Sequence, residues 1–334
     1  MKINIFGVGR SGTKAVQLYI AYLLAEQYGS VHLNYEPYFW LTRSGPVSFA
    51  GLIHHLHSPQ FSIDKKDFST GHQNYLRNTT LGKKVVVTKY IRGNGRILPI
   101  EAITQPDHNI IVIRNVRSVL ESLLYMDWDF STVGYSYFPY SRFSFWRAIK
   151  EYLLTLGEVE LEEYLGKYKS DPISRNAFYW YTMNRFAIEN LPQNHLVVRY
   201  EDLSQLENWA KAAFNLDEKV PVNQRALFEG KKVHQQFPLE DVEPPHISRN
   251  GQRTNELIYY LSKGRGRFLQ KFLKRQPIGN VVQKNNSSSP KPNSQNPSSS
   301  KLKATIAPDV LLDFLQKDID RRIEEVTAAT NALL

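Results

Sequence analysis

The start of the chain constrains its fold more than any other segment, because a glycine-rich turn there separates two regular patterns. Residues 2–6 (KINIF) favour a β-strand, and residues 14–28 show the apolar periodicity of a helix. Between them, Gly7, Gly9 and Gly12 interrupt both patterns. A strand that passes through a tight turn into a helix is the first half of a β-α-β unit. This start therefore predicts an α/β protein with parallel strands.

Strand-like and helical segments continue to alternate along the chain. The run 109–113 (NIIVI) is continuously apolar, as in a strand that is buried on both faces of a parallel sheet. We expect a P-loop-like α/β fold, in which helices cover both faces of a mostly parallel sheet. Further strands are expected at 31–35, 84–90, 109–113 and 196–198, and helices at about 117–125 and 177–190.

Composition divides the chain into three parts. Residues 1–281 are predicted to form the α/β domain. Residues 282–303 are rich in Ser, Asn and Pro and nearly free of large apolar groups, which predicts a flexible linker. Residues 304–334 are predicted to form an amphipathic C-terminal helix. Such a helix either docks on the domain or pairs with a second chain, so 308–334 is a candidate for self-association.

Composition also excludes some classes of protein. The chain has no cysteine, which excludes a disulfide scaffold, a cysteine-ligated metal site and a cysteine nucleophile. The apolar run 3–8 is too short for a signal peptide, and no run of eighteen apolar residues occurs, so we expect a cytoplasmic protein.

The net charge of +10 is compatible either with an excess of solvated basic side chains or with an anionic partner. The basic amphipathic segment 263–275 predicts either peripheral membrane contact or a solvated helix.

The glycine turn itself allows several functions. The pattern G-x-G-x-x-G from Gly7, with Glu36 further on, is that of dinucleotide-binding proteins. The nucleotide P-loop is disfavoured, because Lys14 follows Thr13 where a Gly-Lys-Ser/Thr sequence is required. In a third interpretation, residues 10–13 surround a phosphate-like group with a cation, hydroxyls and backbone amides. An ordinary tight turn between strand and helix explains the same residues without any function.

A second candidate for anion binding favours the third interpretation. Arg114 follows the strand 109–113, and in open α/β sheets ligands bind outside the carboxyl ends of strands. Ser118 and Ser122 are four residues apart on one face of the helix that follows. Arg114 and one of these hydroxyls could hold a phosphate dianion. A dinucleotide-binding enzyme that transfers hydride does not need this second phosphate-binding element.

Together the two elements resemble the sulfotransferases that use 3′-phosphoadenosine 5′-phosphosulfate (PAPS). That family has an Arg/Lys-Ser-Gly-Thr turn for the 5′-phosphosulfate and a later Arg, with a Ser eight residues on, for the 3′-phosphate. The chain has both in order, and residues 35–37 (YEP) and 199–203 (RYEDL) also look similar. Arg10, where soluble aryl and steroid enzymes have lysine, is similar to the carbohydrate-type and bacterial branch. Val116 stands where the family usually has proline.

The resemblance implies in-line transfer of a sulfuryl group from PAPS, without a metal, to a hydroxyl of a saccharide or glycolipid-like acceptor. Glu36 is the expected general base, with His32 as its rival and His54, His55 and His57 as more distant ones. Lys89 either reaches the sulfuryl oxygens or is a surface lysine, and Tyr200 and Trp180 either stack on adenine or belong to the core. The nucleotide-binding set that the resemblance implies is Arg10, Ser11, Gly12, Thr13, Lys14, Arg114, Ser122 and Tyr200.

Two other functions remain open. A P-loop kinase would use ATP and Mg²⁺ and would not need Arg114. A non-enzymatic module would bind polyanions or membranes through its basic surface. Ten aromatic residues in 125–146, interleaved with polar ones, suit a sugar or lipid-linked acceptor, although core packing accounts for some of them. We expect no nucleic-acid partner and no metal site, since no suitable carboxylates accompany the histidines at 54–57.

Overall fold

The computed structural model describes residues 1–35, 37, 63–68, 70–125, 141–215, 240–241 and 308–333. Its centre is a six-stranded sheet in the order β5-β4-β1-β3-β2-β6, in which every neighbouring pair is parallel. The sixth strand is two residues long and lies at the edge beside β2. The strands are β1 (Lys2–Phe6), β2 (His32–Tyr35), β3 (Val86–Tyr90), β4 (His108–Ile113), β5 (His195–Arg199) and β6 (Glu240–Asp241).

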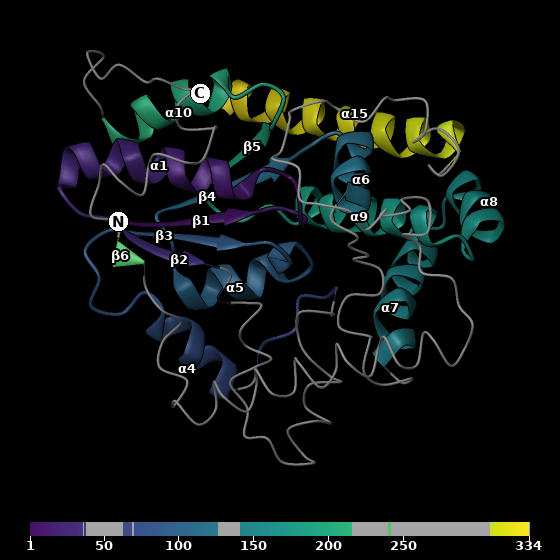
Figure 1. The fold of residues 1–334 in the computed structure, drawn as a ribbon, viewed down its shortest axis with the longest axis horizontal. Coiled ribbons are helices and arrows are strands. Elements are labelled where there is room, and N and C mark those ends of the chain that lie inside the picture. The colour runs from purple at the N-terminus through teal and green to yellow at the C-terminus, as the bar shows by residue number, and fades with distance from the viewer. Residues whose placement is uncertain are drawn as a thin grey trace, which may run out of the picture.

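Helices cover the sheet on both sides (Figure 1). They are α1 (Thr13–Tyr28), α4 (Thr70–Asn78), the short 3-10 helix η2 (Gly93–Arg96), α5 (Ile97–Thr104), α6 (Val116–Tyr125), α7 (Ser141–Thr155), α8 (Val159–Tyr168), α9 (Pro172–Glu189), α10 (Ser204–Phe214) and α15 (Asp309–Leu333). This arrangement confirms the α/β fold with a C-terminal helix.

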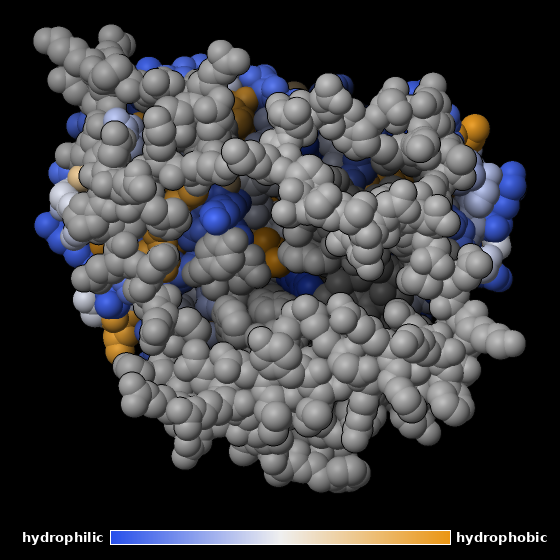
Figure 2. Space-filling model, viewed as in Figure 1, coloured by the Kyte–Doolittle hydropathy of each residue, from blue (hydrophilic) through white to orange (hydrophobic). Residues whose placement is uncertain are grey.

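The alternation of side chains along the strands divides the core into two layers. Ile3 and Ile5 of β1 pack under α1 and α10, whereas Phe6 packs with α4, α5, α6 and α9 on the other face. The helix α9 is buried on nearly all sides, and α15 packs against it. By contrast, α8 buries Leu161 and Leu165 and presents hydrophilic side chains to solvent (Figure 2).

The predicted elements agree with the observed ones to within a few residues wherever the structure describes them. The predicted C-terminal helix corresponds to α15, and its apolar face is buried in the core of the same chain. The predicted linker 282–303 and the basic segment 263–275 lie outside the described residues. In the part of the chain that is described, no helix is both long and apolar enough to cross a membrane.

The order of the described strands creates a topological switch point at the carboxyl edge of the sheet, which is called the crevice here. The strands β1 and β4 are neighbours, but the helices that follow them lie on opposite faces, α1 on one and α6 on the other. The loops after β1 and β4 therefore leave the sheet toward opposite faces. In open α/β sheets, ligands bind at this kind of switch point.

Candidate functional site

The glycine turn after β1 brings the backbone unusually close to a side chain from another loop. Gly12 has a φ of 86°, a left-handed conformation that residues with a side chain rarely adopt. A Cβ atom at this position would lie 2.1 Å from Cε2 of Tyr200, which follows β5. Both the backbone angle and the space therefore require glycine at this position.

The helix α1 begins directly after this turn. Its N-cap residue, Gly12, has no side chain that could accept from the first amides, and the first turn contains no acidic residue. The N–H groups at a helix start and the helix dipole favour an anion at this end. Ser11 is fully buried beside it, and its Oγ has no hydrogen-bond partner among the described residues. A buried hydroxyl without a partner is an unusual feature that a bound anion would explain.

Arg10 joins the glycine turn to the second predicted element. Its Nε donates to Oγ of Ser122 on α6 at 2.7 Å, and its carbonyl oxygen accepts from Nη1 of Arg114 at 3.1 Å. Arg10 also has a φ of 74°, which is strained for a residue with a side chain. The two elements, which are about a hundred residues apart in the sequence, thus contact each other across the crevice between β1 and β4.

Arg114 is fixed from several directions. Nε1 of Trp180 donates to its carbonyl oxygen at 2.9 Å, and its guanidinium lies 5.1 Å from the centre of the Tyr200 ring. Its Nε is buried and has no hydrogen-bond partner in the described part of the chain. Trp180 is fully buried in the core, so it positions Arg114 and does not offer a face for adenine.

The amides at the start of α6 are occupied by acceptors from the protein itself. The N–H of Asn115 donates to Oε1 of Glu201 at 3.0 Å, and that of Val116 donates to Oε1 of Gln316 at 2.8 Å. The Asn115 side chain accepts from the next two amides, those of Arg117 and Ser118. An anion near α6 would consequently meet the side chains of the crevice and not this helix end.

A buried tyrosine, Tyr179, lies beside the glycine turn, close to the backbone of Gly9. Burial raises the pKa of Tyr179 to about 12, although the guanidinium of Arg92 and the backbone of Gly9 act in the opposite direction. Tyr179 therefore keeps its proton near neutral pH and can donate a hydrogen bond. Both Tyr179 and Arg92 are almost fully buried, so they support the turn from inside the protein.

The other predicted site residues that the structure describes lie on β3, α1 and β2. Lys89 lies next to last in β3, beside Ile5 of β1, and is 2% exposed. Lys14 is exposed in the first turn of α1. His32 is the first residue of β2 and pairs in register with the first residue of β3. At about 3.3 Å per residue, it lies roughly 10 Å before the carboxyl end of its strand. The structure thus does not bring His32 to the edge where the glycine turn lies.

The expected base Glu36 lies outside the described residues, as do His54, His55, His57 and most of the aromatic segment 125–146. Among the residues that are described, no group of three or more histidine or acidic side chains is arranged to hold a metal ion. The predicted set that the structure does bring together consists of Arg10, Ser11, Gly12, Thr13, Arg114, Ser122 and Tyr200.

Sequence reasoning missed the residues that hold these loops in place. Asn115, directly before a predicted helix, is a typical N-terminal cap and could have been recognised. Glu201 lies in the RYEDL segment, where each of the first three residues contacts a different neighbour: Arg199 contacts α15, Tyr200 covers Gly12, and Glu201 accepts from Asn115. Gln316 is two hundred residues from its partner, and no local pattern points to it.

No protein-family model, no curated protein and no solved structure matches this chain.

Proposed function

We propose that this protein is a sulfotransferase that moves the sulfuryl group of PAPS to a hydroxyl group of a saccharide or glycolipid-like acceptor. The observation that carries the proposal is the contact between the two anion-binding elements. Arg10 reaches Ser122 at 2.7 Å, and Arg114 reaches the backbone of Arg10 at 3.1 Å. A nucleotide with one anionic group at its 5′ end and another at its 3′ position matches such a pair of neighbouring sites.

The polar atoms around the crevice support a ligand with these two groups. The N-terminal end of α1 and the Oγ of Ser11, which has no hydrogen-bond partner among the described residues, suit the 5′-phosphosulfate. Arg114, whose Nε has no partner in the same part of the chain, and Ser122 suit the 3′-phosphate. The ring of Tyr200, which is partly buried and lies against both Gly12 and Arg114, suits the adenosine part.

In the proposed reaction the acceptor oxygen attacks the sulfur atom in line with the leaving phosphate. The bond between sulfur and the bridging oxygen breaks, and adenosine 3′,5′-bisphosphate leaves with the bonding electrons. The acceptor proton passes to a general base, for which Glu36 stays the prediction. Cations near the sulfuryl and phosphate oxygens stabilise the charge that develops, a role we assign to Arg10 and Lys89.

The cytoplasmic location also stays a prediction from the sequence.

Titration calorimetry with adenosine 3′,5′-bisphosphate, ATP with Mg²⁺, and NAD tests the proposal. We expect the bisphosphate to bind most tightly, and Arg114→Ala to weaken it by about 10- to 100-fold through loss of a charge-assisted contact. Lys83→Ala, an exposed change just before the amino end of β3 and thus at the opposite edge of the sheet, serves as the control. Preference for ATP with Mg²⁺ would indicate a kinase instead. Equal, salt-sensitive binding of all anions would indicate a polyanion-binding module.

A further inference from the structure

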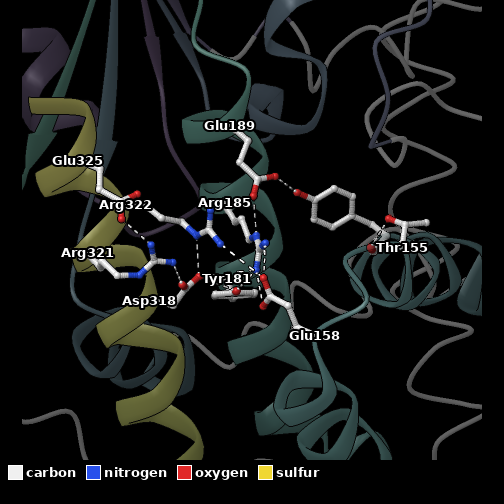
Figure 3. Close-up of polar contacts among 10 residues, drawn as sticks. Thr155, Glu158, Tyr181, Arg185, Glu189, Asp318, Arg321, Arg322 and Glu325 are labelled. Atoms are coloured by element: carbon white, nitrogen blue, oxygen red, sulfur yellow. Dashed lines mark hydrogen bonds and ion pairs between the residues drawn. The ribbon is translucent and has the colours of Figure 1, made fainter. Parts of the chain in front are cut away.

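The helix α15 has three stripes of side chains with different partners. Its apolar stripe lies in the core and consists of Leu311, Leu312, Leu315, Ile319 and Ile323. On one side of this stripe, Asp318 and Arg322 join a network of charges with Arg185 and Glu189 of α9 (Figure 3). On the other side, residues three or four apart form a stripe of hydrogen-bond acceptors. This acceptor stripe consists of Asp309, Asp313, Gln316, Asp320 and Glu324.

The first part of the acceptor stripe contacts the start of α6. Oε1 of Gln316 accepts from the N–H of Val116 at 2.8 Å. The guanidinium of Arg117 forms ion pairs with Asp309 and with Asp313, the latter at 2.9 Å. These hydrogen bonds raise the pKa of Arg117. The helix α15 thus holds Val116 and Arg117 in place, and these residues closely follow Arg114, which faces the crevice.

The second part of the stripe contacts the end of β5. Arg199 pairs with Asp320 at 3.0 Å and with Glu324 at 3.4 Å. The next residue is Tyr200, whose ring covers Gly12 and lies beside Arg114. A hydrogen bond from Nε2 of Gln316 to Asp320, at 3.1 Å, joins the two parts of the stripe.

We propose that the acceptor stripe of α15 positions the two loops that form the 3′-phosphate side of the nucleotide site, with Gln316 and Asp320 as its central positioning residues. The assignment of the ligand rests on the proposed function, but the positioning itself does not. Arg10 and Arg114 lie together in the crevice, and like charges repel each other. The acceptors of α15 neutralise two further arginines on the same two segments, Arg117 after β4 and Arg199 at the end of β5. Arg114 is then held in place for a ligand, and less ordering is required when the ligand binds.

Two variants of the full-length chain test this proposal. Gln316→Met removes the acceptor at Val116 with little change in volume, and Asp320→Asn removes the charge at Arg199. We expect amide hydrogen exchange at Val116, Arg117 and Tyr200 to become about tenfold faster in both, since these loops would open locally more often. We also expect affinity for adenosine 3′,5′-bisphosphate to fall by about three- to tenfold, because the loops would then have to be ordered on binding.

Arg322→Met is the matched control, because it removes contacts on the opposite side of the apolar stripe. It should lower the melting temperature without changing exchange at Val116 or affinity for the bisphosphate. Unchanged exchange in both test variants would overturn the proposal, and so would an equal effect of Arg322→Met on the loops. If the wild-type chain binds no bisphosphate, the proposed function fails, whereas the exchange measurement still decides the role of α15.

Discussion

At the scale of single residues, the contact between Gly12 and Tyr200 determines the shape of the crevice. Gly12→Ala would place a side chain in a left-handed conformation, which costs about 1–2 kcal/mol. The added Cβ would also lie 2.1 Å from the Tyr200 ring and displace it from Arg114. We expect a total loss of about 2–4 kcal/mol in the free energy of unfolding, measured by urea denaturation.

The variant Gly29→Ala separates the cost of the backbone conformation from the cost of the clash with the Tyr200 ring. Gly29 has a similar φ of 78°, but nothing lies within 4 Å of the position of its Cβ. This variant should lose only the backbone contribution, about 1–2 kcal/mol. In the Gly12→Ala background, the further change Tyr200→Ala should recover part of the lost stability. Equal losses in Gly12→Ala and Gly29→Ala would mean that the ring does not cover Gly12.

At the scale of secondary-structure elements, the sequence predicts what depends on local patterns. Strands β1 to β5 and helices α1, α6 and α9 follow from runs of apolar residues and from the turns between them. The meeting of residues 10–13 with Arg114 follows from one further rule, that parallel strands end at the same edge. The partners of Val116 and Arg199 could not be predicted, because their acceptors lie over a hundred residues later. An acidic stripe beside an apolar stripe otherwise looks like an ordinary solvated face.

The junction of α9 with its neighbours depends on one nearly buried arginine. The Arg185 side chain is 5% exposed and binds both oxygens of Glu158, at 2.8 and 2.6 Å, and Glu189 at 2.8 Å (Figure 3). Arg185→Met would leave Glu158 and Glu189 only their ion pairs with Arg322, at 3.6 and 3.0 Å. Both carboxylates are about a third exposed, so water offsets part of the loss, and we expect a decrease of about 2–3 kcal/mol in the free energy of unfolding. Arg321, which is 55% exposed and pairs with Asp318 and Glu325, is the matched control.

Arg321→Met should change the free energy of unfolding by no more than about 1 kcal/mol, because water screens an exposed pair. Chemical denaturation followed by circular dichroism measures both variants. A loss in Arg185→Met as small as that in Arg321→Met would show that the buried network contributes little.

At the scale of the whole molecule, acid should weaken the attachment of α15. Burial raises the pKa of Asp318, but hydrogen bonds from Arg322, Tyr181 and Arg321 outweigh this and hold it below the usual 3.8. A carboxyl group whose pKa is lowered in the folded state stabilises the protein above its unfolded pKa. That stabilisation is lost as the pH falls from about 3.8 through the folded pKa. The melting temperature of the wild type should therefore approach that of Asp318→Asn as the pH is lowered from 7 to below 3.8.

The difference in melting temperature between wild type and Asp318→Asn, measured at a series of pH values, tests whether the stabilisation by Asp318 is lost in acid. A difference that stays constant across the acid range would contradict the lowered pKa. All other carboxyl groups are common to both proteins, so their titration largely cancels in the comparison.

The position of α15 in the chain also affects how the protein is made. A ribosome adds about 5–20 residues per second, so roughly 5–20 s pass between the synthesis of Arg199 and that of Asp309. At the start of that interval strands β1 to β5 have been synthesised, while the surface of α9 that α15 will cover is still exposed and Arg117 and Arg199 lack their carboxylates on α15. A chaperone that recognises apolar surface would find its target at this stage. The loops after β4 and β5 would then take up their final arrangement only after translation has passed α15.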